Sequence, residues 1–248
     1  MNPQAATFRF YGALNDFLHK RQKGHAINYS FKGSPAIKDA IEAIGVPHPE
    51  VDVVLVNQSK VLFSYTLQAG DVVEIFPVQA EREWPTGYVS EEQNPPPHRF
   101  VLDVHLGTLA KSLRMLGFDT FYKTDLSDSE IARIAAEEKR VVLTRDVGLL
   151  KQKSIRWGYW LRSQHTEEQL EEVVQRYKLQ HSFNPLVLCL VCNVRVEEVP
   201  KQEVLEELPP KTRLYFNEFY RCPSCCRVYW KGSHYERMQL FVAKVQRM

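Results

Sequence analysis

Two Cys-x-x-Cys pairs, Cys189/Cys192 and Cys222/Cys225, are the residues of this chain whose chemistry is easiest to infer. A two-residue gap lets both thiolates of a tight turn reach one ion, and two such pairs supply the four sulfur ligands of a tetrahedral Zn²⁺. A disulfide or a redox pair is the competing interpretation. With no secretion signal in view, four thiols in this pattern favour a structural zinc site. Residues 193–221 separate the pairs, which predicts a long excursion from one small ribbon.

Three aspartates follow apolar runs that have the pattern of short strands. Asp103 ends the run that begins at Arg99, Asp128 follows Thr120-Phe-Tyr, and Asp146 follows Val-Val-Leu-Thr-Arg. In open α/β sheets the functional crevice lies beyond the carboxyl ends of the strands, so we expect the three carboxylates there. Each also has a simpler interpretation, since Asp103 and Asp146 could cap helices and Asp128 could occupy a first helical turn.

A cluster of carboxylates would need a counter-charge. Two carboxylates roughly 5 Å apart repel by about 3 kcal/mol at an effective dielectric constant of 20, so protons or a cation must neutralise three of them. Hard oxygen ligands select Mg²⁺ or Mn²⁺, and such ions support attack of an activated water on a phosphodiester. Asp125 and Glu130 lie near Asp128 in the sequence, although Ser127-x-x-Glu130 by itself predicts a capping box.

The stretch around Asp146 is rich in basic and aromatic side chains. Its basic residues are Lys139, Arg140, Arg145, Lys151, Lys153, Arg156 and Arg162, and Trp157, Tyr159 and Trp160 lie among them. Basic side chains bind phosphates and exposed aromatic rings stack on unpaired bases, so the stretch suits a single-stranded nucleic acid. The alternation of Trp157, Tyr159 and Leu161 fits one face of a buried strand equally well, and the basic residues could form a solvated face.

The first 78 residues have the pattern of a small α+β domain. Strand patterns cover Thr7–Tyr11, His25–Phe31, Val51–Val56 and Val72–Phe76, and a helix pattern covers Pro35–Ile44 with Ser34 as the expected N-cap. This ββαββ order resembles the ubiquitin-like β-grasp fold, and in particular the small sulfur-carrier proteins. Those carriers end in Gly-Gly, which is absent here, so we expect a docking or scaffolding module instead.

Residues 79–98 lack periodicity and contain three consecutive prolines, which predicts an interdomain linker. Strand and helix patterns then alternate over residues 99–181. The predicted strands are Arg99–Asp103, Thr120–Tyr122, Val141–Thr144 and Trp157–Leu161, and the predicted helices are Leu106–Leu116, closed by Gly117, Ser127–Lys139 and Thr166–Tyr177. This alternation predicts a mainly parallel sheet covered by helices.

Composition adds only mild constraints. The chain has 248 residues and a net charge of +2, too small a charge to imply nucleic-acid binding by itself. No apolar run approaches the length of a membrane span, and no signal peptide is visible at the N-terminus, so we expect a cytoplasmic protein that does not contact a membrane.

Several motifs in order point to one family. Residues 99–181 contain Leu-Asp-x-x-Leu-Gly-x-Leu-Ala-x-x-Leu-Arg-x-Leu-Gly-Phe-Asp, then Asp-Ser-Glu-Ile, then Val-Val-Leu-Thr-Arg-Asp, and residues 221–238 read Arg-Cys-Pro-x-Cys-x-Arg-Val-Tyr-Trp-Lys-Gly-Ser-His-Tyr-x-Arg-Met. Together they resemble the PIN-like RNase domain named for the C-terminus of the Mut-seven exonuclease. An N-terminal ubiquitin-like domain is also similar to known members.

The resemblance implies roles for particular residues. Asp103, Asp128 and Asp146 match the acidic metal-binding positions. The sequence departs from the pattern at Ser129, where an acid is common, which leaves Asp128 and Glu130 to share that role. It also departs at a fifth cysteine, Cys226, which stands where glycine is expected. Cys226 could compete for the metal, but we interpret it as a bystander whose knuckle is strained or binds metal differently.

The sequence therefore predicts an α/β protein with a β-grasp domain (1–78), a linker (79–98), a PIN-like RNase domain with a mainly parallel sheet (99–181) and a zinc ribbon (182–248). We expect metal-dependent cleavage of RNA, with tRNA and other structured RNAs as candidate substrates and the zinc ribbon assisting RNA binding. Structural Zn²⁺ and catalytic Mg²⁺ or Mn²⁺ are the expected cofactors. The expected RNA contacts are Arg114, Arg145, Lys151, Lys153 and Arg156.

Two other classes of protein fit the same residues. In a non-catalytic RNA-binding adaptor, the carboxylates would only cap helices and the ribbon would bind RNA. In a protein-interaction scaffold, the β-grasp domain would bind a protein partner and affinity for RNA would be weak.

Overall fold

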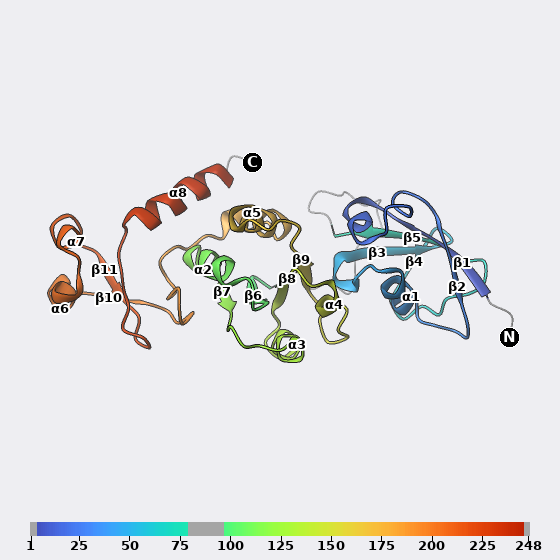
Figure 1. Ribbon diagram of the computed structural model, residues 1–248, viewed down its shortest axis with the longest axis horizontal. Helices are drawn as coiled ribbons and strands as arrows, with labels where there is room; N and C mark the ends of the chain where they lie inside the picture. The colour runs from blue at the N-terminus through green and yellow to red at the C-terminus, as the bar shows by residue number, and fades with distance from the viewer. Residues whose placement is uncertain (1–3, 79–96, 246–248) are drawn as a thin grey trace. The chain divides into compact units, whose positions relative to one another are not determined.

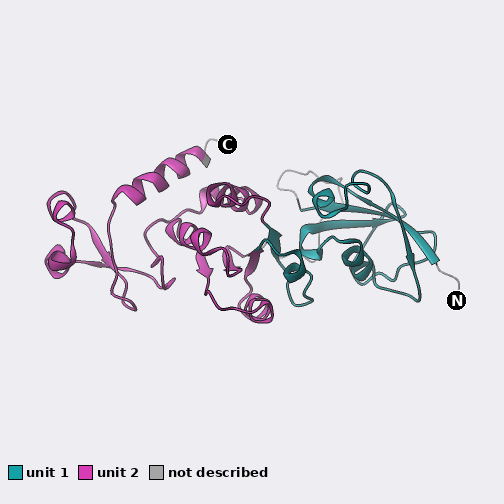
Figure 2. Ribbon diagram, in the orientation of Figure 1, with its two compact units in different colours: residues 1–96, 144–160 teal, residues 97–143, 161–248 magenta. Residues whose placement is uncertain are grey.

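The structure is a computed structural model that describes residues 4–78 and 97–245. The chain forms two compact units, coloured separately in Figure 2. The first comprises residues 1–96 with 144–160, and the second comprises residues 97–143 with 161–248. The predicted linker lies outside the described residues, except for Pro97 and His98. No helix within the described ranges is both long enough and apolar enough to span a membrane.

The first unit contains a five-stranded sheet that packs against a single α-helix, and it has the β-grasp arrangement predicted from the sequence (Figure 1). Its elements are β1 (Gln4–Phe10), η1 (Gly12–Phe17), β2 (Ile27–Phe31), α1 (Ile37–Ile44), η2 (His48–Glu50), β3 (Val51–Val56), β4 (Ser59–Val61) and β5 (Val72–Pro77). The strand order is β2-β1-β5-β3-β4, in which only the β1–β5 pair is parallel. The same unit includes α4 (Val147–Leu150) and β9 (Gly158–Trp160).

Helix α1 begins later than its sequence predicts. The expected N-cap, Ser34, is not used: the N-cap is Ala36, and no side chain caps the helix. Ala36 forms an antiparallel bridge with Thr66, and the amide of Leu67 donates to the carbonyl of Pro35 at 3.0 Å. These bonds hold residues 35 and 36 extended, so the helix starts only at Ile37. Its apolar face then packs into the β-grasp core, as predicted.

The second unit contains a parallel α/β sheet. Its elements in this region are β6 (Arg99–Leu102), α2 (Gly107–Met115), β7 (Asp119–Phe121), α3 (Asp128–Glu137), β8 (Val141–Thr144), α5 (Thr166–Arg176) and η3 (Leu179–His181). Strand β6 pairs in parallel with both β7 and β8 and so lies between them. Residues 100–102 and 141–143 are fully buried, as expected for parallel strands covered on both faces.

Local signals at the helix ends explain where these helices begin and end. Gly117 follows α2 with a φ of +95°, and a Cβ there would lie 2.1 Å from the carbonyl oxygen of Asn184. Only glycine fits this position, which confirms that it closes the helix. Ser127 and Glu130 form the predicted capping box at the start of α3.

The remainder of the second unit is a small ribbon with helical additions. Strands β10 (Glu197–Val199), β11 (Phe219–Arg221) and β12 (Val228–Tyr229) form an antiparallel sheet. The predicted excursion between the cysteine pairs contains α6 (Lys201–Val204), η4 (Leu205–Glu207) and α7 (Pro210–Tyr215), and α8 (Ser233–Val245) follows the ribbon (Figure 1).

Candidate metal centre and acidic residues

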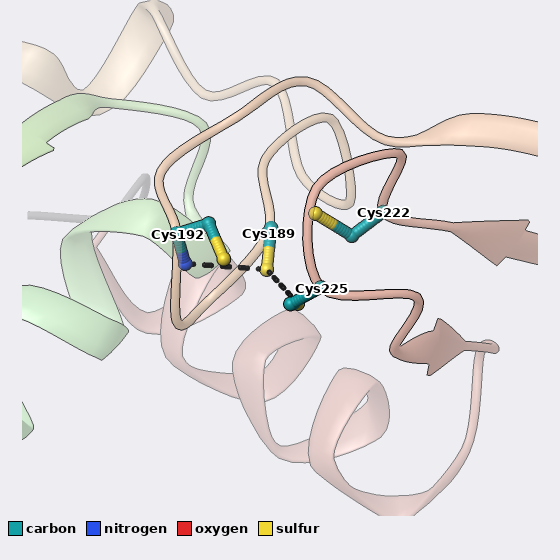
Figure 3. A group of neighbouring side chains, drawn as sticks. All are labelled: Cys189, Cys192, Cys222 and Cys225. Atoms are coloured by element: carbon teal, nitrogen blue, oxygen red, sulfur yellow. Dashed lines mark hydrogen bonds between the residues drawn. The ribbon is translucent and has the colours of Figure 1, made fainter.

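The four cysteines of the two Cys-x-x-Cys pairs converge on one point. Four sulfur atoms lie within 4.8 Å of one another, those of Cys189, Cys192, Cys222 and Cys225 (Figure 3). The sulfurs of Cys189 and Cys225 are 3.6 Å apart. Tetrahedral Zn²⁺ with Zn–S distances of about 2.3 Å places its sulfurs about 3.8 Å apart. The donor set and its spacing therefore fit the zinc ion predicted from the sequence.

The two cysteine turns have the same backbone hydrogen bonds. In the first, the amide of Asn193 donates to the Cys189 carbonyl (2.9 Å) and the amide of Cys189 donates to the Val194 carbonyl (2.8 Å). In the second, the amide of Cys226 donates to the Cys222 carbonyl (2.9 Å) and the amide of Cys222 donates to the Arg227 carbonyl (3.0 Å). Each pair therefore forms a closed knuckle that presents its two sulfurs to the same side.

Cys226 occupies the position in the second knuckle that Asn193 occupies in the first. Both residues have a left-handed backbone, with φ of +58° and +61°. Asparagine tolerates this conformation and glycine adopts it without strain, whereas other residues pay roughly 1 kcal/mol. Cys226 is exposed and lies outside the four-sulfur group. It is therefore a strained bystander, as the sequence predicts.

Hydrogen bonds from the protein favour the thiolate form of Cys189. Its sulfur lies 3.1 Å from the Tyr229 hydroxyl and 3.3 Å from the backbone nitrogen of Cys192. Burial opposes ionisation, yet these hydrogen bonds lower the pKa of Cys189 to about 6. Burial also raises the pKa of Tyr229, so its hydroxyl stays protonated and can donate to the sulfur. A thiolate is the form that a metal binds.

Arg114, expected near RNA phosphates, instead lies inside the second unit. Its side chain is 4% exposed, and its Nε and Nη2 both donate to the Thr120 carbonyl (3.0 and 2.8 Å). Its Nη1 donates to the carbonyls of Leu190 and Val191, at 2.9 Å each. Leu190 and Val191 are the two residues between the first pair of cysteines. Arg114 therefore joins α2 and β7 to the first zinc knuckle.

Asn193 makes a second connection between that knuckle and β7. Its side-chain oxygen accepts from the Thr120 amide (3.0 Å), and its side-chain nitrogen donates to Asp119 Oδ1 (2.6 Å). The Asp119 carboxylate also accepts from the buried Arg140 (2.8 and 3.1 Å). Burial raises the pKa of Asp119, but the hydrogen bonds from Arg140 and Asn193 outweigh it and lower the pKa.

Asp103 lies at the carboxyl end of β6 and is half-buried. Its Oδ1 accepts from the amide of Val104 at 2.6 Å, and its own amide donates to the Leu143 carbonyl of β8. Helix α2 has Leu106 as its N-cap, without a side-chain bond. Asp103 is thus not the cap of this helix. The interpretation of Asp103 as a helix cap, one of the two drawn from the sequence, is wrong.

Asp128 and Asp146 both lie at helix starts. Asp128 is the exposed first residue of α3, directly after the cap Ser127, and Glu130 belongs to the capping box. Asp146 is the N-cap of α4, where its Oδ1 accepts from the amide of Gly148 at 2.6 Å. Asp103 and Asp128 belong to the second unit and Asp146 to the first.

The predicted RNA-binding residues around Asp146 differ in their surroundings. Lys153 and Arg156 are exposed, and the Arg156 guanidinium lies 4.7 Å from the centre of the Trp157 ring. Lys151 is half-buried and its Nζ donates to the carbonyl of Glu42 at 2.8 Å. Arg145 is half-buried. Tyr159 and Leu161 are buried, whereas Trp157 is half-buried and the strand covers only Gly158–Trp160, so the proposed alternation on one strand face holds only in part.

Sequence reasoning did not identify Asn193, Asp119 or Tyr229 as part of the metal centre. Tyr229 lies seven positions after Cys222 in a strand pattern, with no local sign that its hydroxyl reaches Cys189. Asn193 carried one usable signal, because asparagine directly after a cysteine turn suits a left-handed position.

Comparison with known proteins gives two family matches. Residues 98–242 match the family model described as Mut7-C RNAse domain, and residues 3–83 match the model described as Mut7-C ubiquitin. No curated protein and no solved structure matches the chain.

The geometry of the four sulfurs predicts the metal content. The purified protein should carry about one zinc per chain, and Cys222→Ser should be insoluble or free of zinc, because three thiolates hold a structural ion poorly. Metal analysis and circular dichroism during chelation measure both effects, and chelation should unfold the ribbon.

Cys226 provides the matched control, since it adjoins the ligands without joining them. Cys226→Ser should keep its zinc, and Cys226→Gly should raise the free energy of unfolding by roughly 0.5–1 kcal/mol through relief of the left-handed strain. Carefully purified wild-type protein without zinc would contradict the metal assignment.

The position of Arg114 predicts a linkage between the knuckle and the α/β sheet. A lysine in place of Arg114 cannot donate to all three carbonyls that the guanidinium binds. In Arg114→Lys the free energy of unfolding should therefore fall by roughly 2–4 kcal/mol, and a chelator should remove zinc faster. Denaturant unfolding and the rate of zinc release test this. Lys111→Ala, at an exposed position of the same helix, should change neither; equal behaviour of the two variants would rule the linkage out.

Proposed function

The chain belongs to the Mut7-C RNase domain family, whose model covers more than half of its 248 residues, and from this membership we propose that it is a metal-dependent ribonuclease. The match to residues 98–242 is the observation that carries the proposal. The α/β sheet and the four-cysteine ribbon both lie within this range.

The sheet topology supports an acidic site at one edge. Strand β6 runs parallel to β7 and β8, so the carboxyl ends of the three strands point the same way. Asp103 follows β6 directly, Asp128 follows the loop after β7, and Asp146 follows β8 by two residues. Beyond the carboxyl ends of parallel strands is where α/β folds bind their ligands.

We assign Asp103, Asp128 and Asp146 as the ligands of Mg²⁺ or Mn²⁺. Their oxygen donors are the kind that these ions prefer, and three carboxylates that share one site would need such a counter-charge. When bound, the ion would supply an activated water and charge stabilisation for hydrolysis of a phosphodiester. The carboxylates would fix the place of that chemistry, since a capped Asp146 and a β6-anchored Asp103 have restricted backbones.

The basic residues around Asp146 supply the proposed RNA contacts. Arg145, Lys153 and Arg156 remain in this role, and the zinc ribbon would assist. The bond of Lys151 to the Glu42 carbonyl makes it a weaker candidate. We propose tRNA or another structured RNA as substrate, a protein partner for the ubiquitin-like domain, and the cytoplasm as the compartment that suits reduced metal-binding thiols.

A second candidate is an RNA-binding adaptor without catalysis. The observed caps favour it, because Asp146 and Glu130 already have structural roles at helix starts. A carboxylate offers about four acceptor positions, so a capping role is compatible with metal binding. Loss of the charge with retention of the cap separates the two candidates.

Asp103→Asn and Asp146→Asn make that separation. Asparagine keeps an oxygen acceptor for the Val104 amide at position 103 and for the helix cap at position 146, but it lacks the charge that a divalent ion needs. Cleavage of RNA should fall at least about 100-fold while RNA binding survives. Millimolar Mn²⁺ should raise the melting temperature of the wild type more than that of the variants, because only binding to the folded state stabilises it.

Asp39→Asn is the matched control for this experiment. Asp39 is exposed and lies in the first turn of α1, as Asp128 does in α3. It should cleave RNA and respond to Mn²⁺ like the wild type. Undiminished cleavage by both Asp103→Asn and Asp146→Asn would show that the assigned residues are wrong, and a wild type that binds RNA without cleaving it would favour the adaptor.

The exposed basic pair Lys153 and Arg156 predicts a salt-dependent interaction. With both changed to Gln, RNA binding should weaken for all sequences, and the slope of log affinity against log salt should decrease by about 1.4, the value for two lost contacts to a single strand. Fluorescence anisotropy over a salt series measures the slope.

Lys20 and Lys32 are exposed lysines of the β-grasp domain and serve as the control pair. Their change to Gln should leave the slope as it is. An identical slope for the Lys153/Arg156 variant and the wild type would remove these two residues from the RNA contacts.

A further inference from the structure

One short stretch of the β-grasp domain is buried although it contains polar residues. Residues 46–50, Val-Pro-His-Pro-Glu, are all buried, and Glu50 is only 2% exposed. A charged or polar side chain in such a place needs specific partners. The partners of His48 and Glu50 include residues more than a hundred positions later in the chain, within the same compact unit.

These partners lie in residues 144–160, the segment that carries Asp146. His48 Nε2 is 2.6 Å from the carbonyl oxygen of Ile155, and because a carbonyl only accepts, this nitrogen donates. Glu50 Oε1 accepts from the amide of Trp160 at 2.7 Å. A Cβ on Gly158 would lie 3.5 Å from the Pro49 Cβ, an ordinary van der Waals distance, so these two residues pack against each other.

Residues 46–50 form a docking surface for the segment 144–160, which we call the dock. Trp160 connects the dock to the backbone of Asp146. Its ring packs against Phe17 of the β-grasp domain, with the ring centres 5.1 Å apart. Its indole Nε1 donates to the carbonyl of Arg145 at 3.0 Å. The amide on the other side of that peptide bond belongs to Asp146 and donates to the hydroxyl of the buried Thr144 at 2.8 Å.

The peptide unit between Arg145 and Asp146 is thus held at both of its polar groups. Trp160 binds its oxygen and Thr144 binds its N–H, which restricts the direction in which Asp146 presents its carboxylate. We propose that Glu50 and Trp160 are positioning residues for Asp146, and that the ubiquitin-like domain serves the ribonuclease by holding the segment 144–160 in place. This inference rests on the proposed function only for its catalytic consequence.

The chemistry gives the reason for such a device. Helix α4 is only four residues long and cannot order its own N-cap, since a single turn is unstable without outside contacts. A misplacement of about 1 Å at a reacting centre can cost roughly 100-fold in rate. The dock supplies such contacts at Ile155 and Trp160, and it leaves Asp146 itself exposed.

The test uses the full-length chain with Trp160→Phe and Glu50→Ala. Trp160→Phe keeps an aromatic ring against Phe17 but removes the donor to Arg145. The amides of Asp146 and Gly148 should exchange hydrogen roughly three- to tenfold faster in both variants, as expected from the loss of one hydrogen bond. With RNA and Mn²⁺, kcat should fall roughly 10- to 100-fold with KM within about twofold of the wild-type value.

Two further variants separate positioning from general stability. Glu50→Gln retains an oxygen acceptor for the Trp160 amide, so it should restore exchange and kcat close to wild-type values. Tyr65→Phe removes a hydroxyl that donates to Asp71 elsewhere in the β-grasp domain. It should lower the melting temperature without changing exchange at Asp146 and Gly148. If Trp160→Phe does not fold, the Glu50 pair decides the matter alone.

The outcomes distinguish this inference from the proposed function. Wild-type exchange rates in both Trp160→Phe and Glu50→Ala would overturn the positioning role, whatever the activity. Faster exchange with unchanged kcat would overturn its catalytic consequence. A wild-type protein that cleaves no RNA would refute the proposed ribonuclease, while the exchange data would still decide whether the dock orders the Asp146 segment.

Discussion

The hydrogen bonds of the buried Arg114 guanidinium are the interaction on which the second unit most depends. Backbone carbonyls inside a protein need donors, and Arg114 supplies them to three at once. Two of these carbonyls belong to the turn between the first two cysteines. Because Asn193 ties the same turn to β7, the first zinc knuckle is part of the α/β domain as much as of the ribbon. Order in the metal centre and order in the sheet therefore support each other.

The acidic residues illustrate how one side chain can have two physical roles. At Asp146, one carboxylate oxygen completes the start of a short helix. This cap costs little of the acceptor capacity of the group, and it reduces the number of orientations available. Asp128 lies in the first turn of α3, at the positive end of the helix dipole, where a negative charge is stabilising. Helix ends thus suit the presentation of negative charge toward a cation or solvent.

Much of the architecture was predictable because it depends on short-range patterns. The zinc ligands follow from the two-residue spacing within each pair, and the period of apolar residues located α1, α2, α3 and α5 to within a few residues. The start of α1 was wrong because a bridge between Ala36 and Thr66, thirty positions apart, overrides the cap signal of Ser34. Pairing between residues this far apart cannot be predicted from the pattern of a short stretch of sequence.

Arg114 and Lys151 show the same limit for the candidate site. Both are basic residues in stretches where a phosphate contact is a reasonable expectation. Lys151 donates to a carbonyl 109 positions away, and Arg114 donates not only to the nearby Thr120 carbonyl but also to two carbonyls 76 and 77 positions away. A sequence lists the donors of hydrogen bonds but not the loops whose carbonyls will lie beside them. The convergence of the carboxylates is a prediction of the same kind, and only the order of the strands supports it.

The discontinuous first unit has a consequence for synthesis on the ribosome. The β-grasp core uses residues 6–75 and can form early. The carbonyl partner of His48 is 107 residues later, so the surface at residues 46–50 is complete only after residue 160 has emerged. In the meantime the α/β sheet is synthesised through β8, and its last segment must find a domain that is already folded. The N-terminal domain therefore acts as a template on which the end of that segment folds.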